Sequence, residues 1–165
     1  MFVVAYVIVI ICRAFVFVPI EVTGNSMAPT LKQSDFVITE QFSEIKRFDM
    51  IVFHSLDGNT YVKRVIGLPG ETIEYKNDVL YVNGKKIDEE YLEGIKKKKN
   101  GFLYTTDFNS KELLGVKKIP KNNYFVLGDN RRLSKDSRSF GTINSQDIIG
   151  KIRLIYYPLK DFKIF

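Results

Sequence analysis

The sequence has very few of the side chains that cross-link a chain or bind transition metals. Among its 165 residues, Cys12 is the only cysteine and His54 is the only histidine. A single cysteine excludes an intrachain disulfide and a zinc site built from cysteines. A single histidine likewise excludes a histidine-rich metal site. We therefore expect no metal site in this protein.

Internal repeats and low-complexity tracts are also missing, and an aromatic content of 13% favours a packed core over disorder. Basic residues (25) outnumber acidic ones (19), which gives a net charge of +6. That charge would suit nucleic acid or an anionic membrane surface. We expect no nucleic acid partner, because the sequence has neither an aromatic–basic RNA-binding motif nor a helix-turn-helix pattern.

The apolar residues are concentrated at the N-terminus. Residues 1–20 contain 18 apolar residues, interrupted by Arg13 and Pro19. A helix of about 20 residues spans the hydrocarbon core of a bilayer, so we predict a single transmembrane anchor over 1–20. A cleaved signal peptide is the alternative, but no basic region precedes the run and no clear A-x-A site follows it. A helix buried in the protein core is the other alternative. It is disfavoured because a helix that is apolar on all sides is hard to cover completely by one polar domain.

Residues 21–165 are expected to form one mostly antiparallel β domain. Short β-branched runs separated by turn residues predict strands at Asp35–Gln41, Met50–His54, Tyr61–Ile66, Val79–Val82, Lys85–Ile87, Tyr124–Leu127 and Ile148–Tyr157. Asn83-Gly84 lies between two of these runs and is typical of a tight hairpin. Residues 88–120, with lysines at 96–99, lack clear periodicity. We interpret them as a variable, solvated, lysine-rich excursion with room for one short helix.

Two polar blocks could carry chemistry. The first, Gly24–Leu31 (GNSMAPTL), places Ser26 between a glycine and a proline. This spacing predicts an irregular turn that presents the hydroxyl, although a serine in a turn is usually only a turn residue. The second, Tyr61–Glu71, has Lys63 and Arg64 on opposite faces of a strand. Burial would lower the pKa of Lys63 and make it a base near neutral pH, whereas extension of both side chains into water is the plain alternative.

A strand at Asp49–Phe53 leads into His54, and a further polar block follows the strand at 124–127. This block, Leu127–Gly141, reads LGDNRRLSKDSRSFG. Its hydroxyl, carboxylate and guanidinium groups are consistent with a surface loop or with an internal hydrogen-bond network around a site.

In this order, and behind an apolar segment, the motifs GNSMAPTL, YVKRVIGLPGE and GDNRxxSxDSR resemble those of bacterial type I signal peptidases, in particular the Gram-positive members. The resemblance spans essentially the whole chain. It implies a transmembrane helix followed by an antiparallel β-sheet catalytic domain. It also implies a cofactor-free serine endopeptidase that cleaves signal peptides from exported preproteins after small-x-small sites. The enzyme would be anchored in the cytoplasmic membrane, in the lipid bilayer, with its catalytic domain on the extracytoplasmic face.

The same resemblance implies a role for each matching residue. Ser26 matches the nucleophile and Lys63 the base of a serine–lysine dyad. Ser134 matches a serine that hydrogen-bonds and orients the lysine. Asp136 and Arg138 match a supporting ion pair, and Asp129 and Asn130 fall in the same network.

By alignment of the motifs, the substrate pocket would be walled by Val22, Met27, Leu31, Tyr61 and Val62, each of which is also an ordinary core residue by type. The backbone N–H of Ser26 would be one oxyanion donor. Some family members have a hydroxyl two residues before the nucleophile, where this chain has Gly24. The second donor is therefore left open.

Three other functions are weighed against this one. A Ser-His-Asp hydrolase would use Ser26 and His54, but a triad is defined by geometry that a sequence does not give. A self-cleaving repressor-type protease would need a DNA-binding segment where this chain has an apolar run. A catalytically silent, membrane-anchored module that binds preproteins is the remaining alternative, and the presence of both dyad positions argues against it.

Overall fold

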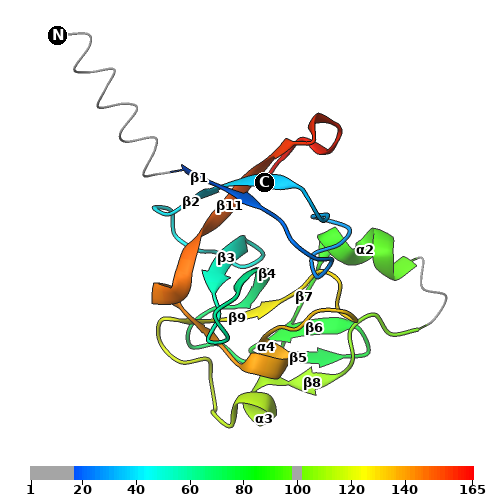
Figure 1. Cartoon of the computed structure of the whole chain (residues 1–165). Helices are drawn as coiled ribbons and strands as arrows, with labels where there is room; N and C mark the ends of the chain where they lie inside the picture. Colours follow the sequence, from blue (N-terminus) through cyan, green and yellow to red (C-terminus); the bar gives the residue numbers. More distant parts are fainter. Residues whose placement is uncertain (1–16, 98–101) are drawn as a thin grey trace.

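The computed structural model describes residues 17–97 and 102–165. Its strands are mostly short, and the described residues also form three small α-helices between them (Figure 1). The strands are β1 (Phe17–Glu21), β2 (Phe36–Glu40), β3 (Met50–His54), β4 (Thr60–Gly67), β5 (Ile73–Lys76), β6 (Val79–Val82), β7 (Lys85–Ile87), β8 (Phe108–Asn109), β9 (Asn123–Leu127), β10 (Ile143–Asn144), β11 (Ile148–Tyr157) and β12 (Lys163–Ile164). The helices are α2 (Glu90–Lys97), α3 (Ser110–Leu114) and α4 (Ser137–Phe140).

Within the described residues, the larger sheet has eight strands in the order β1-β2-β11-β3-β4-β9-β10, with β12 beside β11. Its pairings are all antiparallel, and Lys63 on β4 lies opposite Ile51 on β3. The mostly antiparallel β architecture predicted from the sequence is therefore confirmed. Every predicted strand is present, and Met50–His54 has the predicted bounds.

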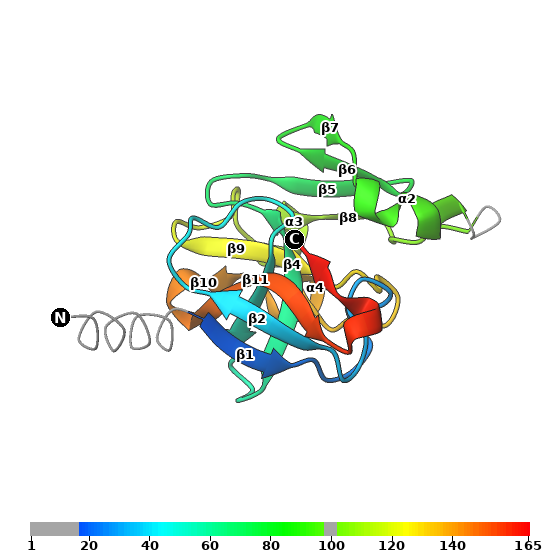
Figure 2. The same ribbon diagram turned by 90° about the horizontal axis from the view of Figure 1, so that it is seen from above.

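The smaller sheet has the order β7-β6-β5-β8 and lies with α2 to one side of the larger sheet (Figure 2). Its β6–β7 hairpin turns at Asn83 and Gly84, which have φ values of 50° and 79°. Both residues thus adopt the left-handed conformation that a two-residue hairpin turn requires. The hairpin predicted from Asn83-Gly84 is confirmed.

The interior contains three clusters of buried apolar side chains. One holds Val22, Met27 and Leu31 against β2, β3 and β11. A second lies between the two sheets, around Ile73, Tyr75 and Phe125, and the third covers the opposite face of β3, β4 and β9. The segment that carries Ser26 is therefore fixed to the larger sheet by its apolar neighbours.

The structure corrects two boundaries. Residues 17–20, the end of the predicted anchor, belong to β1, which pairs with β2 from Phe17↔Glu40 to Glu21↔Phe36. Pro19 is compatible with this position because β1 is an edge strand. The rest of the predicted anchor, residues 1–16, lies outside the described residues. Among residues 17–97 and 102–165, no helix is long and apolar enough to cross a membrane.

The range 88–120 is only in part a solvated excursion. It contains two helices and strand β8, and Leu92, Tyr104 and Ile119 are buried. The sequence does not indicate these elements because the buried apolar residues are widely spaced. No periodic run marks them in the sequence.

Candidate active site

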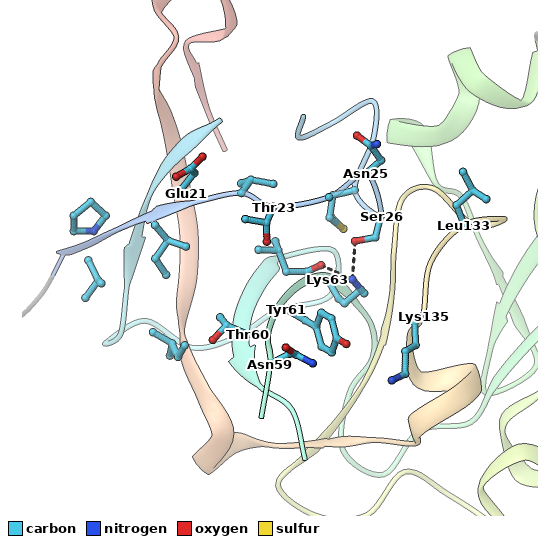
Figure 3. Close-up of a pocket in the computed structure, with 18 residues that line it drawn as sticks. Glu21, Thr23, Asn25, Ser26, Asn59, Thr60, Tyr61, Lys63, Leu133 and Lys135 are labelled. Atoms are coloured by element: carbon cyan, nitrogen blue, oxygen red, sulfur yellow. Dashed lines mark hydrogen bonds between the residues drawn. The ribbon is translucent and has the colours of Figure 1, made fainter. Parts of the chain in front are cut away.

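A surface cleft of about 900 Å³ lies between β1 and the first half of β4. The segment from Val18 to Met27 forms one wall, and residues 59–63 form the other. Leu133 and Lys135 approach from the loop between β9 and α4 (Figure 3). Because β1 is an edge strand, the outer edge of the sheet is open along this cleft. An extended peptide can add to such an edge as a further strand.

Ser26 and Lys63 meet inside this cleft. The Nζ atom of Lys63 donates hydrogen bonds to Ser26 Oγ at 2.7 Å and to the carbonyl oxygen of Val62 at 3.0 Å. Figure 3 shows both contacts, with the Ser26 hydroxyl and the Lys63 amine pointing toward one another. The two residues are 37 positions apart in sequence, and only the folding of the Ser26 segment onto β4 brings them together.

Burial changes the acid–base behaviour of Lys63. The side chain is 2% exposed, and desolvation lowers its pKa from the ordinary 10.5 to about 8. Attraction by the carboxylates of Asp136 and Asp129 acts in the opposite direction and limits the decrease. A substantial fraction of Lys63 is therefore neutral near pH 8, as a general base requires.

The segment that carries Ser26 is held by backbone contacts. Gly24 has φ = 79°, a left-handed conformation that favours glycine and turns the chain toward Ser26. The backbone N–H of Leu31 donates to Met27 O at 3.0 Å. From the loop after β9, Asn130 donates its backbone N–H to Ser26 O at 3.0 Å and its side-chain amide to Asn25 O at 3.2 Å. Asn130 thus fixes the backbone on both sides of the Asn25–Ser26 peptide.

Two buried ion pairs support the loops around the dyad. Asp129 accepts two hydrogen bonds from Arg64, at 2.8 Å from Nε and 2.6 Å from a terminal nitrogen. Asp136 accepts two from the guanidinium of Arg138, both at 2.8 Å, and others from the backbone N–H groups of Arg138 at 3.3 Å and Gly128 at 3.1 Å. Both carboxylates are fully buried. Neighbouring side chains on a strand point to opposite faces, as predicted for these two residues. Lys63 points toward Ser26 and Arg64 toward Asp129.

Ser134 differs from its expected role. Its Oγ is buried and has no hydrogen-bond partner among the described residues, so the expected bond to Lys63 is not present. Lys63 instead bonds with Ser26 and Val62 O. The Ser134 side chain lies against Gly128, where an added Cβ would overlap it and would also come within 2.5 Å of Ser26 O. The glycine therefore permits a close approach of Ser134 to the Ser26 segment.

Four of the five expected pocket residues line the cleft, namely Val22, Met27, Tyr61 and Val62. Leu31 does not line it. That side chain is completely buried in the cluster with Val37 and Ile155, so its role is to pack the core. The motif that contains both Ser26 and Leu31 turns back between them, which places one in the cleft and the other beneath the sheet.

His54 is not part of the site. It does not line the cleft, and its Nδ1 is 3.3 Å from Thr60 Oγ1 at the exposed end of β3. Ile51, rather than His54, pairs with Lys63, and residues three apart on a strand face opposite sides. A Ser26–His54 catalytic pair is therefore incompatible with this geometry. The described residues also contain no group of three histidine, cysteine or acidic side chains that could hold a metal.

Sequence reasoning missed several residues of the cleft. Val18, Pro19 and Ile20 lie on β1, although the sequence places them in the apolar segment, and Glu21 completes that strand. Leu133 and Lys135 also line the cleft, whereas the motif that contains them assigns them no role there. Pro19, with Glu21 two residues later, is the signal that separates an edge strand from a membrane helix here.

The cleft brings a serine hydroxyl and a buried lysine amine within hydrogen-bond distance, which is the arrangement of nucleophile and base that serine hydrolases use. Residues 1–157 match the family model described as signal peptidase, peptidase S26. A signal peptidase I of Bacillus caldolyticus is 48% identical over 163 residues, which cover 96% of this chain and 90% of that protein. A signal peptidase IB of Staphylococcus aureus is 45% identical over 168 residues, covering 97% and 88%. The crystal structure of a signal peptidase I from Enterococcus faecalis, 42% identical, superposes with a TM-score of 0.62 over 66% of this chain and 97% of that one.

The chain therefore belongs to the signal peptidase family S26, whose members are serine endopeptidases. The resemblance inferred from the three motifs is confirmed.

Proposed function

We propose that Ser26 and Lys63 are the catalytic dyad of a membrane-bound endopeptidase that removes signal peptides from exported preproteins. The observation that carries this proposal is the 2.7 Å contact between Ser26 Oγ and the buried Lys63 amine inside an open cleft. A serine hydroxyl is a weak nucleophile without an adjacent base, and here the base is already within hydrogen-bond distance.

The chemistry proceeds in two acyl-transfer steps. With Lys63 neutral, Ser26 Oγ attacks the scissile carbonyl carbon and its proton passes to Lys63 Nζ. The C–N bond then breaks, the ammonium of Lys63 returns the proton to the leaving amine, and an ester to Ser26 remains. Water attacks that ester while Lys63 accepts a proton from it. The bond between the acyl carbon and Ser26 Oγ then breaks, Lys63 returns the proton to Ser26 Oγ, and the signal peptide leaves with a new C-terminal carboxyl group. The carbonyl of Val62 accepts from Nζ and keeps the amine directed at Ser26.

The substrate would bind as an extended strand along β1. Val22, Met27, Tyr61 and Val62 present an apolar surface next to Ser26, and they would accept small side chains and exclude larger ones by overlap. The two buried ion pairs of Asp129 and Asp136 hold the neighbouring loops in place and do not contact the reacting atoms. Asn130 positions the Ser26 backbone.

The enzyme acts at the cytoplasmic membrane, with a single-pass anchor in the apolar N-terminal segment and the β domain on the extracytoplasmic face. Two features support this placement: the apolar composition of that segment, and the start of β1 directly after it, along the cleft. The anchor would hold the cleft close to the bilayer in which signal peptides of the substrates reside.

The experiment is cleavage of a purified preprotein with an A-x-A site by the full chain in detergent micelles. Wild type is compared with Ser26→Ala, Lys63→Ala and His54→Ala. We expect cleavage at the A-x-A site by wild type and His54→Ala, and loss of cleavage in the other two variants, all of them folded by circular dichroism. His54→Ala is the matched control because it removes the other base that the sequence offers.

Each departure from this pattern has a defined meaning. A folded wild type that binds preprotein without cleaving it would show a silent binding module. Persistence of the rate in Lys63→Ala would eliminate Lys63 as the base, and loss of activity in His54→Ala would contradict the geometry described above.

A further inference from the structure

Two residues that line the cleft, Tyr61 and Lys135, are joined by a bridge of side chains that the catalytic dyad does not use. Asp57, in the turn between β3 and β4, accepts a hydrogen bond from Tyr61 OH at 2.9 Å and forms an ion pair with Lys135 at 3.1 Å, both through one carboxylate oxygen. The other oxygen accepts the backbone N–H of Asn59 at 3.1 Å, which fixes the carboxylate within its turn. The bridge therefore joins the β3–β4 turn to the loop that carries Ser134.

Tyr61 connects this bridge to the dyad. Its ring lines the cleft and lies 5.1 Å from Lys63 Nζ. On β4, Tyr61 and Lys63 are two residues apart and share a face. The ring is also stacked on Phe140, with an interplanar angle of 7° and centroids 6.3 Å apart. Figure 3 shows the hydroxyl end of Tyr61 and the amine of Lys135 directed toward one another. The ring is thus held by Phe140 at its side and by Asp57 at its tip.

Three hydrogen bonds to the Asp57 carboxylate fix its orientation. Hydrogen bonds from Lys135, Asn59 and Tyr61 keep the pKa of the Asp57 carboxyl well below its usual range. The carboxylate is therefore ionised throughout the pH range in which Lys63 titrates. An exposed ion pair alone contributes little to stability. Here the same carboxylate also sets the position of an aromatic ring inside the cleft, so its effect should be on recognition.

We propose that Asp57 is a positioning residue for substrate selection: through its contacts with Lys135 and Tyr61, it fixes the ring that limits how large a side chain the cleft accepts beside the cleavage site. This inference rests on the proposed function of the cleft. Asp57 itself does not line the cleft and acts only through Tyr61. A free ring could turn away and admit larger side chains.

The test is the ratio of kcat/KM for two preproteins that carry alanine or valine immediately before the cut. Asp57→Ala removes the acceptor, and Tyr61→Phe keeps the ring but removes the hydroxyl. We expect each variant to lower the alanine-to-valine ratio by roughly three- to ten-fold, the range of one modest hydrogen bond. The double variant should lower it no further, because both changes break the same contact. Asp57→Asn, which retains an acceptor oxygen for Tyr61, should restore most of the ratio.

Asp88→Ala is the matched control. It breaks the Lys86–Asp88 pair, which has the same 3.1 Å length but lies after β7 on the smaller sheet. It should leave the ratio unchanged. The inference is overturned if the ratio of Asp57→Ala equals that of wild type, or if Asp88→Ala changes the ratio equally. Failure of the proposed function is distinguishable, because then wild type would cleave neither preprotein.

Discussion

Replacing Lys63 by methionine should make the stability of the protein respond differently to pH. Lys63 is 2% exposed and burial lowers its pKa from 10.5 to about 8. Below pH 8 the folded protein must hold a charged amine in a desolvated position. Methionine has a similar length and no charge, so Lys63→Met removes that cost at every pH.

The magnitude follows from the shift of the pKa. One pKa unit corresponds to about 1.4 kcal/mol, so the charged amine destabilises the folded wild type by about 3 kcal/mol at pH 7. Between pH 8 and 10.5 the unfolded chain binds the proton more strongly than the folded chain does. The unfolding free energy of wild type therefore rises with pH in this window. At pH 10 about 1 kcal/mol of the cost remains, so wild type should gain about 2 kcal/mol relative to Lys63→Met between pH 7 and pH 10.

The assay is urea unfolding of the full-length proteins in detergent micelles at pH 7, 8, 9 and 10, with tyrosine fluorescence as the signal. The hydrogen bonds to Ser26 and Val62 O that methionine lacks shift the difference between the two proteins by a nearly constant amount. The pH dependence of the difference therefore isolates the ionisation of Lys63.

Lys135→Met is the control because it removes a lysine of the same cleft whose pKa is shifted in the opposite direction. The hydrogen bond to Asp57 raises the pKa of exposed Lys135. Its small stabilisation is complete below pH 10.5 and is lost at higher pH, so wild type should gain nothing over Lys135→Met between pH 7 and 10. Parallel pH profiles for wild type and Lys63→Met would refute the reasoning, because they would show that folding does not lower the pKa of Lys63.

Three further results are expected. The kcat/KM for preprotein cleavage should rise with pH through about 8 and then level off, since only neutral Lys63 accepts a proton; a flat profile from pH 6 to 9 would contradict this. Gly128→Ala should abolish most cleavage, because its Cβ would press on Ser134 and on Ser26 O, whereas Gly94→Ala in α2, with open space around it, should leave activity unchanged. Arg131→Met should lower the unfolding free energy by about 3–5 kcal/mol, because Glu89, 2.6 Å away, would lose its buried partner. Thermal unfolding measures this loss, and Arg132→Met, at the exposed neighbouring position, is the control in the same assay.

The local pattern of β-branched and turn residues was enough to predict most strands of this fold. β2, β3, β4 and the β6–β7 hairpin combine β-branched residues with bounding turn residues, and each lies within a residue or two of its predicted position. Strands β8, β10 and β12 have only two residues each, too few to form a period. β5 was missed because only two of its four residues are apolar, with charged Glu74 and Lys76 between and after them, and only one residue is β-branched.

The predictions were wrong where an apolar sequence fits two different environments, such as a membrane and an edge strand, or the core and the cleft. The run at 17–20 is as apolar as the membrane segment before it, and only its pairing with β2 shows that it is a strand. Leu31 and Met27 belong to one motif and are equally apolar, yet one is in the core and the other also lines the cleft. Hydrophobicity predicts that such residues avoid water, and it does not specify which apolar surface they face.

The sequence by itself determined the class of protein, the nucleophile and base to test, and the mostly antiparallel architecture, because motifs and strand periodicity are local properties of the chain. Only the tertiary structure decided the chemistry of the cleft. The pKa of Lys63, its contact with Ser26 and the bridge from Lys135 through Asp57 to Tyr61 depend on segments 4 to 78 residues apart. Desolvation and hydrogen bonding act over a few ångströms in space, and separation along the sequence does not measure that distance.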